Sequence, residues 1–175
     1  MGLFTVGHST RSLDELVDLL RAHDVALLGD VRTVPASRRV PHFGRAVLAQ
    51  ELPERGVEYQ HLPALGGLRR PRLDSPNTGW RNQAFRGFAD HMATGEFRDA
   101  LDRVVELGRD RHVALMCAEA VPWRCHRSLI ADALTVRGLE VRHILGGGRT
   151  QPHALTPFAR LQDGLLTYPG VPGQG

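Results

Sequence analysis

The sequence alternates between short apolar runs and segments with helical periodicity, and this alternation constrains the fold more than any other feature. The clearest example is the pair formed by residues 12–20 and 25–31. Ser12 and Glu15 have the spacing of a capping box, and apolar residues then recur every three or four positions through Leu20. Residues 25–31 are almost continuously apolar, as expected for a strand covered on both faces. A helix followed by a buried strand predicts a sheet packed between helices.

The alternation continues along most of the chain. Strands that alternate with helices favour parallel pairing, because each helix carries the chain back along the sheet. We therefore predict an α/β fold, consisting of one doubly wound, mainly parallel sheet flanked by helices. Further strands are predicted at residues 3–7, 57–62, 112–116 and 139–145, and further helices at residues 45–54, 83–92, 96–108 and 125–137.

Two segments depart from this pattern and are rich in glycine and proline. Residues 63–82 predict a long surface loop, a feature that is often functional within a compact domain. Residues 146–175 predict a C-terminal extension, in which residues 157–162 have the pattern of one short helix. We expect a single domain over residues 1–175, with an ordered core over about residues 3–145.

Composition and cysteine content exclude several classes of protein. The chain has 175 residues, of which 42% are hydrophobic and 23% charged, and these values are typical of a globular domain rather than a disordered chain. No apolar run approaches the ~20 residues that a membrane helix needs. The first residues lack the pattern of a secretory signal, and Cys117 and Cys125 are too few for a disulfide framework. We therefore expect a cytoplasmic protein with reduced thiols and no membrane partner.

One residue type carries the positive charge of the chain. The 22 basic residues are all arginine, and the formal net charge is +3. Arginine is a planar, bidentate donor that suits phosphate and carboxylate groups. A net charge of this size does not by itself indicate nucleic-acid binding, so the arginines have to be judged by their positions.

Polar and charged residues follow the predicted strands at their carboxyl ends. In an open parallel sheet, ligands bind beyond these ends, so the residues there form the candidate site. They are His8, Ser9 and Thr10 after the first strand, Asp30 and Arg32 after the second, and Cys117, Glu119, Arg124, His126 and Arg127 after the fourth.

The same segments carry a resemblance to a known family. The motifs are Val6-Gly7-His8-Ser9-Thr10, Asp30-Val31-Arg32, Leu65-Gly66-Gly67, Met116-Cys117-Ala118-Glu119 and Cys125-His126-Arg127, in this order along the chain. On these motifs the sequence resembles the bacterial family called domain of unknown function 488, over nearly the whole chain. The resemblance implies a compact α/β domain and brings no established reaction with it.

Two carboxylates at the strand ends give the first functional hypothesis. Asp30 and Glu119 could bind ribose hydroxyls or stabilise the oxocarbenium-like state of a glycosidic cleavage. Arg32, Arg124 and Arg127 could hold a phosphate group through bidentate hydrogen bonds. Together they predict an enzyme that acts on an anionic, phosphate-bearing substrate such as a nucleotide or a nucleic acid. The alternative is that the pairs Asp30–Arg32 and Glu119–Arg127 are structural. In the enzyme hypothesis the pocket also contains His8, Ser9, Thr10, Cys117 and His126.

Cys117 gives the second hypothesis. A thiol at a strand end, followed by a loop and a helix, has the position of a cysteine nucleophile whose thiolate the helix N-terminus stabilises. Residues 30–32 also resemble rhodanese-like domains, and the combination predicts a cysteine-dependent sulfur or phosphoryl transferase. Against this, the loop of residues 118–123 contains no glycine and carries Glu119, which would repel an anion. A buried structural cysteine is the alternative.

Two arginine-rich stretches give a third hypothesis, a non-catalytic nucleic-acid-binding module. Residues 38–45 and 69–81 combine arginine with aromatic side chains, which can contact phosphates and stack on bases. Solvated loops are the alternative. For metals, the spacing of Cys117, Cys125 and His126 matches no recognised zinc pattern, so we expect no metal site. The sequence specifies no cofactor and no oligomeric state.

Overall fold

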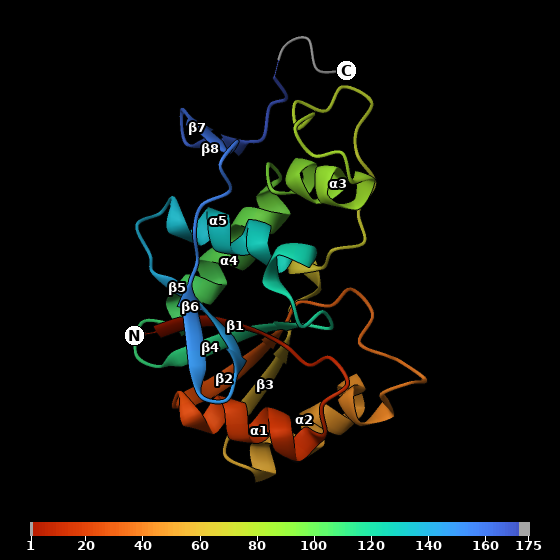
Figure 1. The fold of residues 1–175 in the computed structure, drawn as a ribbon, viewed down its shortest axis with the longest axis vertical. Coiled ribbons are helices and arrows are strands. Elements are labelled where there is room, and N and C mark those ends of the chain that lie inside the picture. Colours follow the sequence, from red (N-terminus) through yellow and green to blue (C-terminus); the bar gives the residue numbers. More distant parts are fainter. Residues whose placement is uncertain (1, 172–175) are drawn as a thin grey trace.

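A six-stranded sheet forms the centre of the protein in the computed structural model, which describes residues 2–171 (Figure 1). The strand order is β3-β2-β4-β1-β5-β6; the first five of these strands are parallel, and β6 is antiparallel to β5. The predicted α/β fold with a mainly parallel sheet is therefore confirmed. The strands are β1 (Gly2–Gly7), β2 (Val25–Asp30), β3 (Glu58–His61), β4 (His112–Cys117), β5 (Val141–Gly146) and β6 (Arg149–Pro152).

Five helices cover the two faces of the sheet. Helices α1 and α2 lie on one face, and α3, α4 and α5 lie on the other (Figure 1). No helix within residues 2–171 is long and apolar enough to cross a membrane. The helices are α1 (Leu13–Ala22), α2 (Arg45–Glu54), α3 (Gln83–His91), α4 (Gly95–Leu107) and α5 (Arg127–Thr135).

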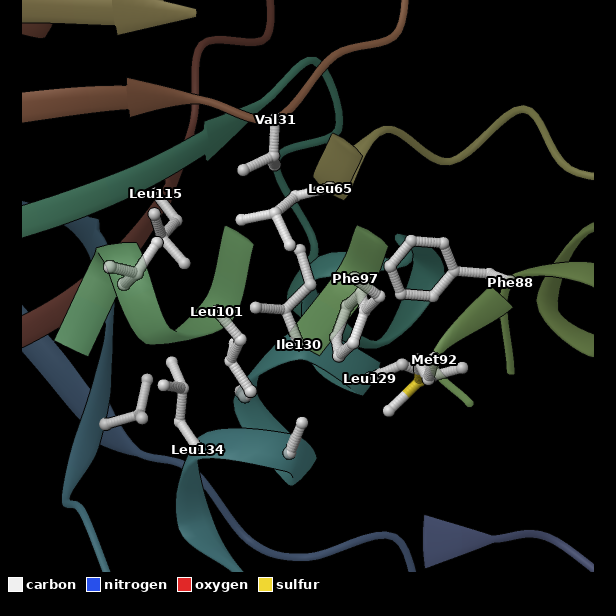
Figure 2. Packing of buried hydrophobic residues seen from close by; sticks show 14 of the residues in the cluster. Val31, Leu65, Phe88, Met92, Phe97, Leu101, Leu115, Leu129, Ile130 and Leu134 are labelled. Atoms are coloured by element: carbon white, nitrogen blue, oxygen red, sulfur yellow. The ribbon is translucent and has the colours of Figure 1, made fainter. Parts of the chain in front are cut away.

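Each face of the sheet has its own apolar core. Because successive side chains of a strand point to opposite faces, Leu115 packs against the α3–α5 layer and Met116 against the α1–α2 layer. Figure 2 shows the larger core, to which Leu115 of β4, Leu101 of α4 and Ile130 of α5 belong. Burial on both faces explains why the strands read as continuous apolar runs.

The predicted capping box at the start of α1 is present. The Ser12 hydroxyl accepts a hydrogen bond from the Glu15 backbone N–H at 3.0 Å, and the Ser12 backbone N–H donates to the Glu15 carboxylate at 3.0 Å. Such a cap contributes about 1 kcal/mol to helix stability. It fixes where α1 begins, and so how far the segment after β1 extends before the chain turns into the helix.

The carboxyl ends of β2, β4 and β1 lie side by side, and this arrangement positions the candidate site. Gly7 is paired with Cys117, and Asp30 is paired with Met116. The chain leaves β1 toward α1 on one face, and it leaves β4 toward α5 on the opposite face. Connections that diverge in this way open a crevice between adjacent strand ends.

The C-terminal segment differs from its prediction. The short helix expected over residues 157–162 is wrong: a hairpin of β7 (Arg160–Gln162) and β8 (Leu165–Thr167) is found instead. Asp163 and Gly164 have φ angles of 53° and 78°, which suit a two-residue hairpin turn. This Asp-Gly pair is the sequence signal that the helical interpretation missed.

A buried polar network fastens the C-terminal segment to α5. The Asp132 carboxylate, which is fully buried, accepts hydrogen bonds from the hydroxyls of Tyr168 at 2.8 Å and Thr156 at 2.7 Å. His153 contacts the same carboxylate through Nε2 at 2.7 Å, and its Nδ1 lies 2.9 Å from His143 Nε2. The segment after β5 is therefore packed against the domain.

Candidate functional site

A cavity of about 590 Å³ lies at the strand ends, and we call it the rim cavity. Its volume falls within the range of small-molecule sites, ~300–1,000 Å³. Two of the ten predicted site residues, Asp30 and Arg127, are fully buried and are not part of its lining. The other eight line it: His8, Ser9, Thr10, Arg32, Cys117, Glu119, Arg124 and His126.

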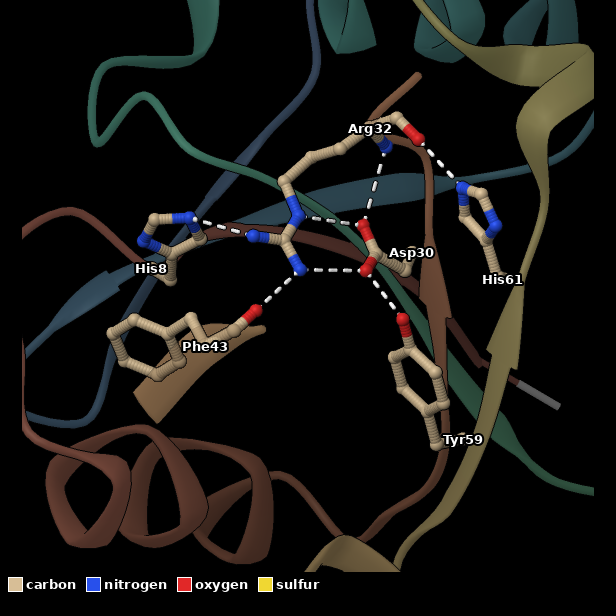
Figure 3. Close-up of polar contacts among 6 residues, drawn as sticks. All are labelled: His8, Asp30, Arg32, Phe43, Tyr59 and His61. Carbon is tan, nitrogen blue, oxygen red and sulfur yellow. Dashed lines mark hydrogen bonds and ion pairs between the residues drawn. The ribbon is translucent and has the colours of Figure 1, made fainter. Parts of the chain in front are cut away.

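Asp30 belongs to a closed cluster of polar contacts, shown in Figure 3. Its carboxylate accepts from Arg32 Nε at 2.8 Å, from Arg32 Nη2 at 2.7 Å and from the Tyr59 hydroxyl at 2.6 Å. Arg32 Nη2 also donates to the Phe43 carbonyl at 2.7 Å. Both oxygens of Asp30 are thus occupied by side chains of the protein, and the cluster ties β2 to β3 and to the segment before α2.

His8 completes this cluster on the side of the rim cavity. Its Nδ1 lies 2.8 Å from the Ser9 carbonyl, and its Nε2 lies 3.3 Å from Arg32 Nη1. A carbonyl accepts and a guanidinium donates, so Nδ1 carries the hydrogen and Nε2 offers the lone pair. Burial lowers the pKa of His8, which keeps the imidazole neutral. The ring also stacks on Phe43, with centroids 4.5 Å apart.

Tyr59 is a member of the cluster that the sequence interpretation missed. Burial, together with the neighbouring Asp30 carboxylate, raises the pKa of the Tyr59 hydroxyl, so that it stays protonated and donates to that carboxylate. A tyrosine within a strand carries no pattern that distinguishes a polar partner from an ordinary core residue. Its role depends on the pairing of β3 with β2, which sequence alone does not fix.

Cys117 lies at the centre of a second cluster, on the α3–α5 side of the sheet. Arg127 Nη1 donates to the Cys117 Sγ at 2.9 Å, and the Cys125 thiol donates to the same sulfur at 2.7 Å. Arg127 also donates to the carbonyls of Glu119 at 2.6 Å and Ala120 at 3.0 Å. Within residues 2–171 its Nε has no hydrogen-bond partner and no carboxylate pairs with it.

These contacts give the two thiols opposite acidities. Burial by itself would raise the pKa of Cys117, but the hydrogen bond from Cys125 and the charge of Arg127 outweigh burial and lower this pKa to about 7. The pKa of Cys125 is raised, because its thiol donates to Cys117 and is buried. Cys117 is therefore the thiol of the pair that ionises near neutral pH, and Cys125 keeps its proton there.

The loop after β4 approaches β1 so closely that only glycine fits. A Cβ atom on Gly7 would lie 1.9 Å from the Glu119 carbonyl oxygen, the same oxygen that accepts from Arg127. The next residues continue the pairing, as the backbone N–H of His8 donates to the Cys117 carbonyl at 3.0 Å and that of Ser9 to the Ala118 carbonyl at 2.9 Å. The motif around Gly7 thus holds the Cys117 loop in place.

His126 connects Cys125 to the segment that follows β2. Its Nε2 lies 2.9 Å from the Val31 carbonyl and therefore carries the hydrogen, which leaves a lone pair on Nδ1, 3.4 Å from Cys125 Sγ. Burial lowers the pKa of His126, so the ring is neutral. A Cβ on Gly67 would meet the ring at 2.5 Å, so this glycine allows the loop after β3 to pack against the imidazole.

Three charged side chains of the rim cavity face solvent. Glu119, Arg124 and Arg39 are exposed and line the cavity, although Arg39 was not among the predicted site residues. In the described part of the chain, neither arginine side chain forms an ion pair. No group of three potential metal ligands is found among residues 2–171. The two arginines are suited to bind an anion, whereas the negative charge of Glu119 opposes one.

The sequence shared with other proteins covers most of this arrangement. The chain matches the family described as domain of unknown function DUF488 over residues 12–134, which includes the Asp30 cluster apart from His8, and the entire Cys117 cluster. The first strand and the segment after α5 lie outside the match, which is therefore shorter than the resemblance stated above. No curated protein and no solved structure gives a significant match. With more than half of its length matched, and with Cys117, Cys125 and Arg127 inside that length, the chain belongs to the DUF488 family.

Proposed function

We propose that the protein is a cysteine-dependent transferase in which the Cys117 thiolate attacks an anionic substrate in the rim cavity. The observation that carries this proposal is the contact of the buried Arg127 guanidinium with Cys117 Sγ at 2.9 Å. An arginine stays charged in a protein, and a buried charge is unfavourable without an opposite one. Because no carboxylate within residues 2–171 pairs with Arg127, the Cys117 thiolate is its natural counter-ion.

The substrate would be anionic because of the groups that surround the thiolate. Arg39 and Arg124 line the cavity with no carboxylate partner in the described residues, and Ser9 and Thr10, which carry hydroxyls, line it as well. These groups attract and orient an anion, while the two buried arginines, Arg32 and Arg127, bind groups of the protein itself. The proposal keeps the anionic substrate expected from the sequence and moves the central chemical role to Cys117.

The two carboxylates of the first hypothesis have different places in this proposal. Both oxygens of Asp30 accept hydrogen bonds from Arg32 and Tyr59, so this carboxylate stabilises the end of β2 and does not contact a substrate. Glu119 is exposed at the cavity, and its negative charge opposes an anionic substrate. Glu119→Gln therefore separates the hypotheses, because it removes a catalytic group in the first and removes a repulsion in the second.

Alkylation of Cys117 by neutral iodoacetamide and by anionic iodoacetate tests the proposal. We expect the rate to rise with a midpoint near pH 7, the pKa of Cys117, rather than near the ~8.5 of a free thiol. The preference for iodoacetate, which is the ratio of its rate to that of iodoacetamide, should be higher for the folded protein than for the unfolded chain. Glu119→Gln should increase this preference, and Arg39→Ala and Arg124→Ala should each decrease it.

Arg38→Ala is the matched control, because Arg38 is an exposed neighbour of Arg39 that does not line the cavity. It changes the net charge of the protein equally but should leave the preference for iodoacetate nearly unaltered. A midpoint at the free-thiol value, or the same preference in all four variants, would show that Cys117 is an ordinary buried cysteine.

A further inference from the structure

The sulfur atoms of Cys117 and Cys125 are in direct contact, 2.7 Å apart, and both residues line the rim cavity. The two come from different elements, since Cys117 ends β4 and Cys125 lies just before α5. Neither forms a disulfide in this structure. A thiolate and a protonated thiol that share one cavity form a pair in which one sulfur can attack a substrate and the other can attack the resulting adduct.

The surroundings of Cys125 supply a base for its proton. His126 Nδ1 lies 3.4 Å from Cys125 Sγ, and the hydrogen bond from Nε2 to the Val31 carbonyl places the ring hydrogen on Nε2 and the lone pair on Nδ1. The imidazole cannot turn easily, because the loop at Gly67 packs against it. Cys125 thus has a donor position toward Cys117 and an acceptor beside it, which is the arrangement that an activated nucleophile requires.

We propose that Cys117 and Cys125 together perform thiol–disulfide exchange on an anionic molecule that contains a sulfur–sulfur bond. This inference rests on the proposed function, since it needs Cys117 as the attacking thiolate, and it identifies the substrate as a disulfide rather than a phosphate ester. The placement of Arg127 supports this choice. Its guanidinium is buried outside the cavity lining and donates to the Glu119 and Ala120 carbonyls, so it holds the loop and the thiolate instead of a substrate phosphate.

The chemistry proceeds in two balanced steps. In the first, the Cys117 thiolate attacks one sulfur of the disulfide R–S–S–R, which forms Cys117–S–S–R and releases one thiolate R–S⁻. In the second, the Cys125 thiol transfers its proton to His126 Nδ1, attacks Cys117 Sγ and releases the second R–S⁻. The substrate gains two electrons, and the cysteine pair loses two and becomes a disulfide. A dithiol reductant, acting by the same exchange in reverse, restores the pair.

The test uses dithiobis(nitrobenzoate), an anionic disulfide that releases a coloured thiolate. We expect the native protein to release two coloured thiolates per chain at near-neutral pH, and its mass to fall by two hydrogen atoms without any retained nitrothiobenzoate group. Dithiothreitol should restore the original mass. Cys125→Ser should release one thiolate and retain the group on Cys117, whereas Cys117→Ser should react much more slowly than either.

The mass of the treated wild-type chain decides the inference even where a variant fails to fold. A single released thiolate, with the adduct retained on Cys117 and Cys125 free, would overturn the exchange and leave Cys117 as a nucleophile. Equal rates for wild type and Cys117→Ser would overturn the proposed function as well. His126→Gln should keep the first release and slow the second; an unchanged second release would remove His126 from the step.

Discussion

The Asp30 cluster and the Cys117 cluster lie at neighbouring strand ends but on opposite faces of the sheet. Asp30 has the same side-chain direction as Leu28, toward α1 and α2, whereas Cys117 packs with the core of α3–α5. In the first cluster every charge has a partner of opposite sign. In the second, Arg127 donates to the Cys117 sulfur and to two carbonyls, and Cys117 is one of the residues that line the cavity. Similar polar residues thus produce a cluster closed by an ion pair on one face, and on the other face a cluster in which a buried guanidinium contacts a sulfur atom.

Removing Asp30 should have the largest effect on this comparison. We expect Asp30→Ala to lower the free energy of unfolding by about 3–5 kcal/mol, because Arg32 is left buried without its carboxylate. Chemical denaturation followed by circular dichroism measures the loss. Glu119→Ala is the matched control, since Glu119 is exposed and its removal should change stability by less than about 0.5 kcal/mol. Equal losses of stability would contradict the structural role that distinguishes Asp30 from Glu119.

Tyr59→Phe removes a single hydrogen bond from the closed cluster and leaves its ion pair intact. The hydroxyl donates to a buried carboxylate at 2.6 Å, so we expect a loss of about 1.5–3 kcal/mol in the free energy of unfolding. The rate of Cys117 alkylation should not change, because the two clusters lie on opposite faces. A changed alkylation rate in a folded Tyr59→Phe protein would show that the clusters are coupled.

Arg127→Met tests the second cluster from its charged side. Without the guanidinium, the pKa of Cys117 should rise from about 7, and alkylation at pH 7 should slow by about tenfold for each unit of that rise above neutrality. Arg127→Lys keeps the charge and should slow the reaction less. The melting temperature of each variant confirms that it is folded. An unaltered rate in Arg127→Met would mean that the hydrogen bond from Cys125, and not the charge of Arg127, lowers the pKa of Cys117.

The last prediction concerns the pH dependence of stability. It comes from His143, which belongs to the buried network around Asp132. Burial lowers the pKa of His143 to about 4, below the ~6.5 of an unfolded chain. Between these pH values the unfolded state binds more protons than the folded state. The contribution of His143 to the free energy of unfolding is therefore fully present above about pH 6.5 and decreases as the pH falls toward 4. We expect a slope below about 1.4 kcal/mol per pH unit. His143→Gln should flatten the profile measured by denaturation; an equally steep profile would assign the effect to other groups.

The strand ends could be predicted to converge, because parallel strands in one sheet share a carboxyl edge. Which face each residue takes could not be predicted. Asp30 still belongs to the paired part of β2, so the pleat directs its side chain into the α1–α2 layer. Glu119 lies two residues beyond β4, where no pleat acts on it, and it reaches the cavity. A difference of one or two residues in a strand boundary thus separated a structural carboxylate from an exposed one.

Cys125 escaped prediction for a related reason. The predicted helix begins at residue 125, and a cysteine at the start of a helix is typical of a core residue. Helix α5 begins at Arg127 instead, after a short 3₁₀ turn over Pro122–Arg124. This turn brings Cys125 back to Cys117 across seven intervening residues. Such a return depends on the conformation of the loop and leaves no periodic pattern.

The position of β1 has a practical meaning for the family match. This strand lies between β4 and β5 in the sheet, yet the matched segment begins only at Ser12. A truncated chain that starts there would lose a central strand, detach β5 and β6, and leave the edge of β4 open to pairing with other molecules. The matched stretch is therefore shorter than the stretch that forms the complete sheet of this protein.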